Sequence, residues 1–346
     1  MTSRLARRAP AGAAITLAVA LGVTSLHAHR SLTAGATGTA DTDGAPGDFG
    51  EPRALSATSA TDTTERTLTH GGRTRTYLVH DFGRGEPAPV VIVLHGGGGN
   101  AAHAVKMTGF DRIAAREGAI AVYPNGTAAR DRGILLTWNA GHCCASAMQH
   151  DLDDVGFVNA IIDALVASKR ADPSRVYVTG MSNGAMMAHR LGRELSAKIA
   201  AIAPVVGAVF GDEPAPRGPM PAFIVVGADD AVVPPDGGSL QLRALLGRRS
   251  AADRDVSPAM AQATYWARHN GCGEPVRSST KSAATSSWTG CTSGASVVFH
   301  SVTGNGHAWP GGEAGRRGAA EPTKDFAASA EMWAFFTSQR RPAHGR

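Results

Sequence analysis

A pentapeptide with a glycine at each end constrains the fold of this chain more than any other feature. Gly180-Met-Ser-Asn-Gly184 follows a short β-branched run, 175–179, and leads into helical spacing that continues to Glu194. A strand that turns sharply into a helix leaves no room for a Cβ at the flanking glycines, and it projects the central side chain from the carboxyl edge of a sheet. The segment therefore predicts a strand–turn–helix unit with Ser182 at its tip.

Branched apolar runs alternate with helical patterns along the rest of the chain. The run Pro-Val-Val-Ile-Val-Leu at 89–94 is typical of a strand that is buried on both faces of a parallel sheet. Strands are expected at 75–80, 89–94, 119–123, 175–179, 199–206, 222–226 and 296–302, and helices at 101–117, 151–169, 183–194, 258–269 and 326–336. This alternation predicts the α/β class, with a mostly parallel central sheet and helices on both faces.

The first 64 residues differ in composition from the rest. Arg4, Arg7 and Arg8 precede an apolar stretch, 11–23, that is too short to span a bilayer comfortably. We expect residues 1–30 to be a signal peptide, cleaved between Ser25 and Ala34; an uncleaved anchoring helix is the alternative. Residues 31–64 are rich in Ala, Thr, Gly and Asp, which predicts a disordered linker. The folded domain would then span 65–340 of a secreted protein.

The net charge is less informative than it first looks. The formal value is +5, but the first thirty residues hold four arginines and no acidic residue, so the remainder carries only +1. A nearly neutral domain offers no electrostatic argument for nucleic acid or an anionic membrane surface as a partner. We therefore expect no nucleic-acid partner and no stable membrane anchor.

A serine hydroxyl becomes an effective nucleophile only beside a general base. His307 lies in a loop framed by glycines, 304–312, after the last expected strand, and Asp229 and Asp230 follow the strand at 222–226. The chain order serine, acid, histidine is that of α/β-hydrolases. The residues predict a catalytic triad of Ser182 and His307 with one of the two aspartates, and spacing alone leaves both aspartates open. A structural turn and an ordinary loop histidine are the alternatives.

Two backbone amides are needed to stabilise the negative charge that develops on the attacked carbonyl oxygen. The amide of Asn183 is one candidate, and the glycine run at 96–99 supplies the other, for which Gly97 is the best placed. That run lacks the Gly-Lys-Ser/Thr ending of a phosphate-binding loop. We therefore expect acyl transfer that uses neither a metal nor an organic cofactor.

With these residues assembled, the chain resembles the polyhydroxybutyrate (PHB) depolymerase-like esterases, relatives of bacterial feruloyl and acetylxylan esterases. The shared motifs are Leu94-His-Gly-Gly-Gly-Gly-Asn100, Tyr123-Pro-Asn-Gly126, Trp138-Asn-Ala-Gly with Cys143-Cys144, Asp153-Asp-Val-Gly-Phe157, Gly180-Met-Ser-Asn-Gly184 and Gly304-Asn-Gly-His-Ala-Trp-Pro-Gly-Gly312. The resemblance implies that Asp230 is the acid of the triad. This sequence departs from the family pattern at two positions: it has Val226 where the family has histidine, and Asp229 where the family has alanine.

The resemblance also bears on cysteines and on the pocket. It implies a disulfide between Cys272 and Cys291, worth about 3 kcal/mol in the chain-entropy model. Cys143 and Cys144 could be joined or free. Either tryptophan of the shared motifs could form a wall of the acyl pocket or belong to the core; these residues are Trp138 and Trp309. The pair Asp153-Asp154 could cap a helix or order the loop that carries Trp138.

These observations predict a secreted serine esterase. Its substrates would be carboxylic esters, namely feruloyl or acetyl groups on polysaccharide or short hydroxyalkanoate oligomers. A peptidase or acyltransferase that uses the same triad is one alternative, because fold analogy does not separate these activities. A non-catalytic exported binding domain is the other.

Overall fold

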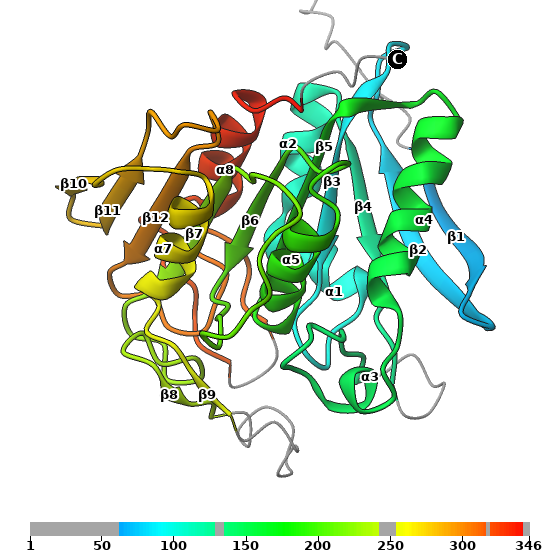
Figure 1. The fold of residues 1–346 in the computed structure, drawn as a ribbon. Helices are drawn as coiled ribbons and strands as arrows, with labels where there is room; N and C mark the ends of the chain where they lie inside the picture. The colour runs from blue at the N-terminus through cyan, green and yellow to red at the C-terminus, as the bar shows by residue number, and fades with distance from the viewer. Residues whose placement is uncertain (1–61, 129–134, 242–253, 316–318, 342–346) are drawn as a thin grey trace, which may run out of the picture. The chain divides into compact units, whose positions relative to one another are not determined.

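A ten-stranded sheet dominates the computed structural model, which describes residues 62–128, 135–241, 254–315 and 319–341 (Figure 1). The expected signal peptide and most of the expected linker lie outside these residues. The strand order is β1-β2-β4-β3-β5-β6-β7-β12-β11-β10. The strands are β1 (Asp62–His70), β2 (Arg73–Asp81), β3 (Ala88–Leu94), β4 (Ile120–Pro124), β5 (Ala171–Met181), β6 (Ala201–Val205), β7 (Ala222–Gly227), β10 (Val276–Ser279), β11 (Ala283–Trp288) and β12 (Val297–Val302). A separate pair, β8 (Gly238–Ser239) and β9 (Asp255–Val256), is antiparallel.

Across the middle of the sheet, strands β4, β3, β5, β6, β7 and β12 are parallel to one another. Antiparallel strands flank them, β2 and β1 on one side and β11 and β10 on the other. Strand β3 shows how the sheet builds two cores, because every one of its residues is buried. Its side chains alternate in direction: Ile92 and Leu94 join one apolar cluster, and Val91 and Val93 join the other. A continuous apolar run therefore serves both faces.

Helices cover both faces of the sheet (Figure 1). Helices α4 (Asp154–Ala167), α5 (Asn183–Glu194) and α7 (Met260–His269) pack in the first cluster, and α1 (Ala101–Thr108), α2 (Phe110–Glu117) and α8 (Ala328–Thr337) in the second. A short helix, α3 (Ala145–Gln149), lies in the long loop after β4. The predicted α/β class, with a mostly parallel sheet between two helical layers, is confirmed.

Several elements differ from the expectation. The helix expected at 101–117 is two helices, because Gly109 between them has φ 56° and both ends the first and precedes the second. Strand β1 begins at Asp62, inside the last residues of the expected linker, and pairs with β2 across the glycine turn at 71–72. Strands β10 and β11 were also not expected. These three strands lie at or next to the edges of the sheet, are rich in Thr or Ser and lack the apolar run that marks a buried strand.

The topology brings four loops to one edge of the sheet. They follow the carboxyl ends of β3, β5, β7 and β12, which all run in the same direction. Ligands of open α/β sheets bind at this edge. None of the helices within the described ranges is long and apolar enough to cross a membrane.

Candidate active site

Ser182 occupies the tight turn between β5 and α5. Its backbone has φ 56° and ψ −120°, and its amide donates to the Val205 carbonyl of β6 at 3.0 Å. The turn has no space for side chains at its flanks: a Cβ at Gly180 would collide with the carbonyl of Gly184, and a Cβ at Gly184 with the carbonyl of His95. The strained backbone holds the hydroxyl at the carboxyl edge of the sheet.

Three side chains from separate loops form a hydrogen-bonded chain at this edge. The Nε2 atom of His307 lies 2.9 Å from the hydroxyl of Ser182, and its Nδ1 atom lies 2.8 Å from Oδ2 of Asp230. Because a carboxylate only accepts hydrogen bonds, Nδ1 carries the proton and Nε2 accepts from the hydroxyl. The three residues are 8%, 7% and 5% exposed in the order His307, Ser182 and Asp230. Asp229, the other candidate acid, is exposed to solvent.

Both partners of Ser182 are held by main-chain contacts. The Oδ1 atom of Asp230 accepts from the amides of Val232 and Val233 at 2.8 and 2.9 Å, so the carboxylate is fixed before it meets the imidazole. The loop of His307 closes around Asn305, whose Nδ2 atom donates to the carbonyls of residues 306 and 308 at 2.9 and 3.0 Å. The sequence reasoning gave Asn305 no role. A polar residue between two glycines, beside the candidate base, is the signal that could have identified it.

The glycine loop after β3 lies directly against the turn of Ser182. A Cβ built on Gly96 would lie 3.7 Å from that of Ser182, and one built on Gly97 would lie 3.6 Å from that of Asn183. Asn183 is the first residue of α5, so its amide lies at the positive end of the helix dipole. The two residues whose amides are expected to stabilise an oxyanion are thus neighbours beside the serine.

An apolar pocket opens at these residues. Its described lining includes Ser182, His307, Gly97 and Asn183, and most of its other walls are apolar: Met107, Met181, Met186, Trp309 and the pair Cys143–Cys144. Trp309 also donates its indole N–H to Ser329 at 2.9 Å, which anchors the ring. Two further titratable residues, His103 and Glu313, are also part of its described lining.

Trp138 is placed differently from Trp309. It is fully buried and is not among the described residues that line the pocket. Its indole lies behind the glycine loop, tilted against the His95 ring with 4.9 Å between the ring centroids. Of the two tryptophans expected as candidate walls, only Trp309 borders the cavity.

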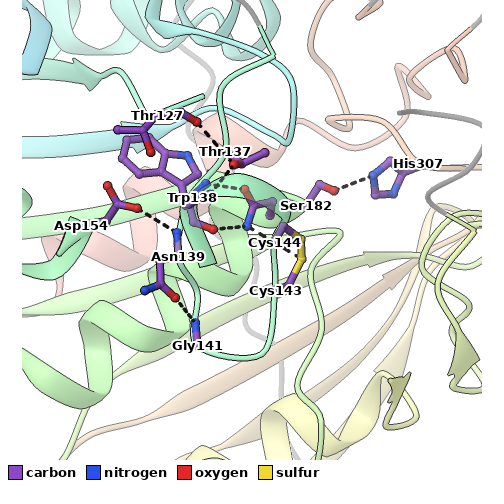
Figure 2. The surroundings of a disulfide bond; sticks show 12 residues. Thr127, Thr137, Trp138, Asn139, Gly141, Cys143, Cys144, Asp154, Ser182 and His307 are labelled. Carbon is purple, nitrogen blue, oxygen red and sulfur yellow. Dashed lines mark hydrogen bonds between the residues drawn. A yellow bond between two sulfur atoms is a disulfide. The ribbon is translucent and has the colours of Figure 1, made fainter. Parts of the chain in front are cut away.

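The four cysteines form two pairs in the structure. Cys143 and Cys144, left open by the sequence, are joined in a disulfide beside Ser182 (Figure 2). Cys272 and Cys291 form the second pair, which ties the end of α7 to the connection between β11 and β12. Strand β12 leads into the loop of His307, so this link lies on the path to the candidate base.

The two roles considered for Asp153-Asp154 are divided between the two residues. Asp153 caps α4, where its side chain accepts from the Gly156 amide at 2.8 Å. Asp154 is fully buried and accepts from Arg75 at 2.7 Å and from the Asn139 amide at 2.8 Å (Figure 2). Burial raises the pKa of Asp154 above its ordinary value, and the Arg75 guanidinium opposes this shift. Asp154 therefore orders the loop that carries Trp138.

Within the described part of the chain, no three His, Cys, Asp or Glu side chains are grouped so that they could hold a metal ion.

Comparison with known proteins adds to this geometry. A family model described as "Esterase PHB depolymerase" matches residues 77–222. NocK of Nocardia uniformis subsp. tsuyamanensis, a protein named as an esterase, is 31% identical over 268 residues, which cover 72% of this chain and 75% of that protein. Feruloyl esterase B of Piromyces equi is 29% identical over 66% of this chain, which spans 41% of that protein's length.

Among solved structures, the acetyl xylan esterase from Aspergillus awamori matches with a TM-score of 0.50 and 13% identity, over 71% of this chain and 94% of that one. This likeness shows a shared α/β-hydrolase fold. The family match and the identity to NocK, with which this shared fold agrees, show that the chain belongs to the PHB depolymerase-like esterases and is a carboxylic ester hydrolase.

Proposed function

We propose that the chain is a secreted serine esterase in which Ser182 is the nucleophile, His307 the general base and Asp230 the carboxylate that orients the base. The observation that supports this most is the continuous hydrogen-bonded chain from the hydroxyl to the carboxylate, at the mouth of an apolar pocket. In these hydrogen bonds the His307 imidazole carries its proton on Nδ1, so Nε2 has no proton and faces the Ser182 hydroxyl.

The reaction would proceed in two acyl-transfer steps. His307 takes the hydroxyl proton while the Ser182 oxygen attacks the ester carbonyl, and the tetrahedral intermediate collapses to an acyl-enzyme as His307 returns the proton to the leaving alkoxide. Water then attacks the acyl carbonyl while His307 takes its proton, and the second tetrahedral intermediate collapses to the carboxylic acid as His307 returns that proton to the Ser182 oxygen. Asp230 stabilises the imidazolium in both steps.

The amides of Gly97 and Asn183 would stabilise the oxyanion. Two observations support this role. Gly97 and Asn183 lie next to each other beside the serine, and Asn183 is at the start of α5, where the helix dipole favours negative charge. Preorganised donors of this kind are worth about 10²–10³-fold in kcat when one of them is removed.

For the substrate, we propose esters whose acyl group is apolar or aromatic, such as feruloyl, with acetyl and short hydroxyalkanoyl esters as the further members of the test set. The support is the lining of the pocket by methionines, Trp309 and a disulfide. Soft, unbranched side chains adapt to flat apolar groups. The name of one relative, a feruloyl esterase, agrees with an aromatic acyl group, and the name of another, an acetylxylan esterase/xylanase, is the reason for including acetyl esters in the test set.

The assignment of the nucleophile is tested with Ser182→Ala. We expect this variant to lose hydrolysis of p-nitrophenyl butyrate and labelling by a fluorophosphonate probe, while its melting temperature stays close to that of the unaltered protein. Unchanged hydrolysis would overturn the triad. A panel of methyl ferulate, acetylated xylan and hydroxybutyrate oligomers then ranks the substrates by kcat/KM, and a preference for acetylated xylan over methyl ferulate would overturn the aromatic acyl proposal.

Secretion is proposed from the sequence pattern of residues 1–30 and the linker that follows, ahead of a catalytic domain at 65–340. Mass spectrometry of the protein recovered from the culture medium should find an N-terminus between Ser25 and Ala34. Recovery of the intact chain in the membrane fraction would contradict cleavage.

A further inference from the structure

One buried residue contacts both backbone segments that carry the proposed oxyanion donors. The main chain of Trp138 pairs with the side chain of Asn183: the Trp138 amide donates to Oδ1 at 2.8 Å, and Nδ2 donates to the Trp138 carbonyl at 3.1 Å. At its other end, the indole N–H of Trp138 donates to the His95 carbonyl at 2.9 Å. Trp138 thus spans from the start of α5 to the start of the glycine loop.

The contact with His95 extends to the amide of Gly97. The His95 ring lies against the Trp138 indole, accepts from the Gly126 amide through Nε2 at 3.0 Å, and so carries its proton on Nδ1. That Nδ1–H donates to the Gly96 carbonyl at 2.8 Å. Carbonyl and amide of one peptide plane point in opposite directions, so fixing the Gly96 carbonyl also fixes the direction of the Gly97 N–H.

The glycine loop needs such a brace because it has no side chains of its own. Glycine populates more of the backbone conformational space than other residues, so the orientation of its amide depends on hydrogen bonds, here those that the Gly96 carbonyl accepts from His95 and from the Gly99 amide at 2.9 Å. Trp138 is itself held in place by the next residue, Asn139, which donates its amide to buried Asp154 (Figure 2). The Asn139 carbonyl also accepts from Arg190 at 2.8 Å. Asp154 is in turn paired with buried Arg75.

We propose that Trp138 is a positioning residue that aligns both oxyanion donors, the amides of Gly97 and Asn183, without touching the substrate. The inference rests on the proposed esterase function. It predicts that Trp138 acts on the transition state, whose negative charge the amides meet, and hardly on the binding of the uncharged ester.

The test is Trp138→Phe, which keeps an aromatic ring in the core and removes the indole N–H from the His95 carbonyl. Misalignment of donors by about 1 Å costs up to about 10²-fold in rate, so we expect kcat for p-nitrophenyl butyrate to fall about 10-fold to 100-fold, with KM changed less than about threefold. A trifluoromethyl ketone forms an anionic adduct with the serine that mimics the tetrahedral intermediate. Its inhibition constant should rise by the same factor as kcat falls.

Trp266→Phe is the matched control. Trp266 is also fully buried and donates its indole N–H to a buried acceptor, Nδ1 of His189, at 2.9 Å. It belongs to α7 and contacts α5 through this bond, and it is not among the described residues that line the pocket. Both variants should lower the melting temperature by similar amounts. Only Trp138→Phe should weaken inhibition by the ketone, because only this variant loses a hydrogen bond to the glycine loop that carries an oxyanion donor.

The possible outcomes separate the inference from the function on which it rests. An unaltered enzyme that neither hydrolyses esters nor reacts with a fluorophosphonate overturns the proposed function. If the enzyme is active but folded Trp138→Phe keeps kcat and ketone affinity within about twofold, or changes KM alone, the positioning role is wrong. Should Trp138→Phe fail to fold, Asn183→Ala retains its own main-chain N–H, cuts both bonds to Trp138, and is judged by the same criteria.

Discussion

Replacing Asp230 by asparagine tests the triad through a single proton. In the structure one carboxylate oxygen accepts from two backbone amides, those of Val232 and Val233, and the other accepts from His307. An asparagine has one oxygen and one NH₂ group. The oxygen must remain with the two amides, since an NH₂ group there would leave both amide donors buried without an acceptor. The NH₂ group therefore faces His307.

This orientation dictates the size of the effect. An NH₂ group donates to Nδ1, so the imidazole must carry its proton on Nε2, where it faces the hydroxyl of Ser182 and cannot accept the hydroxyl proton. The same change in a serine protease triad lowers kcat about 10⁴-fold for this reason. We expect a fall of about 10³–10⁴-fold in Asp230→Asn, which at 10⁴ is about 5.5 kcal/mol in the activation barrier.

The assay is steady-state hydrolysis of p-nitrophenyl butyrate at pH 7.5, with melting temperatures measured in parallel. Asp229→Asn is the control, because it makes the same change of charge at the exposed neighbouring residue. It should keep kcat within about twofold. The reasoning is refuted if Asp230→Asn retains more than about a tenth of the activity, or if Asp229→Asn is the variant that loses it.

Two further predictions concern stability. Replacing Cys272 and Cys291 together by serine opens a link between residues 19 apart, so the free energy of unfolding should fall by about 3 kcal/mol in urea denaturation; a fall below about 1 kcal/mol would contradict the loop-entropy argument. Burial lowers the pKa of His189 to about 4, so the unfolded chain takes up a proton near pH 6.5 that the folded protein does not take up until about pH 4. Stability should therefore fall as pH falls, by about 2 kcal/mol per such group between pH 7 and pH 5, and less steeply in His189→Gln, where His300, whose pKa burial also lowers to about 4, still titrates. Equal losses in the unaltered protein and in His189→Gln would show that His189 is not responsible.

Local sequence was enough to predict the parts of the fold that depend on a residue's own neighbours in the chain. A strand buried on both faces needs a continuous apolar run, as at 89–94, and a strand that turns at once into a helix needs glycine at both flanks of Ser182. The mostly parallel sheet and the chain order of Ser182, Asp230 and His307 follow from such local signals together with the rules of strand connection. The structure brings these three side chains within hydrogen-bond distance.

What only the tertiary structure decided depends on contacts between distant residues. Spacing left both aspartates open and the family resemblance implied Asp230; in the structure it is the Asp230 side chain that contacts the imidazole 77 residues away, and the place of Trp138 came from its bonds to Asn183 and His95. Edge strands such as β1 and β10 bury too little apolar surface to leave a pattern, so their pairing is visible only once their neighbours are in place. Short-range periodicity records how a residue is buried, whereas the partner of a buried polar group is set by packing, and no spacing in the sequence encodes it.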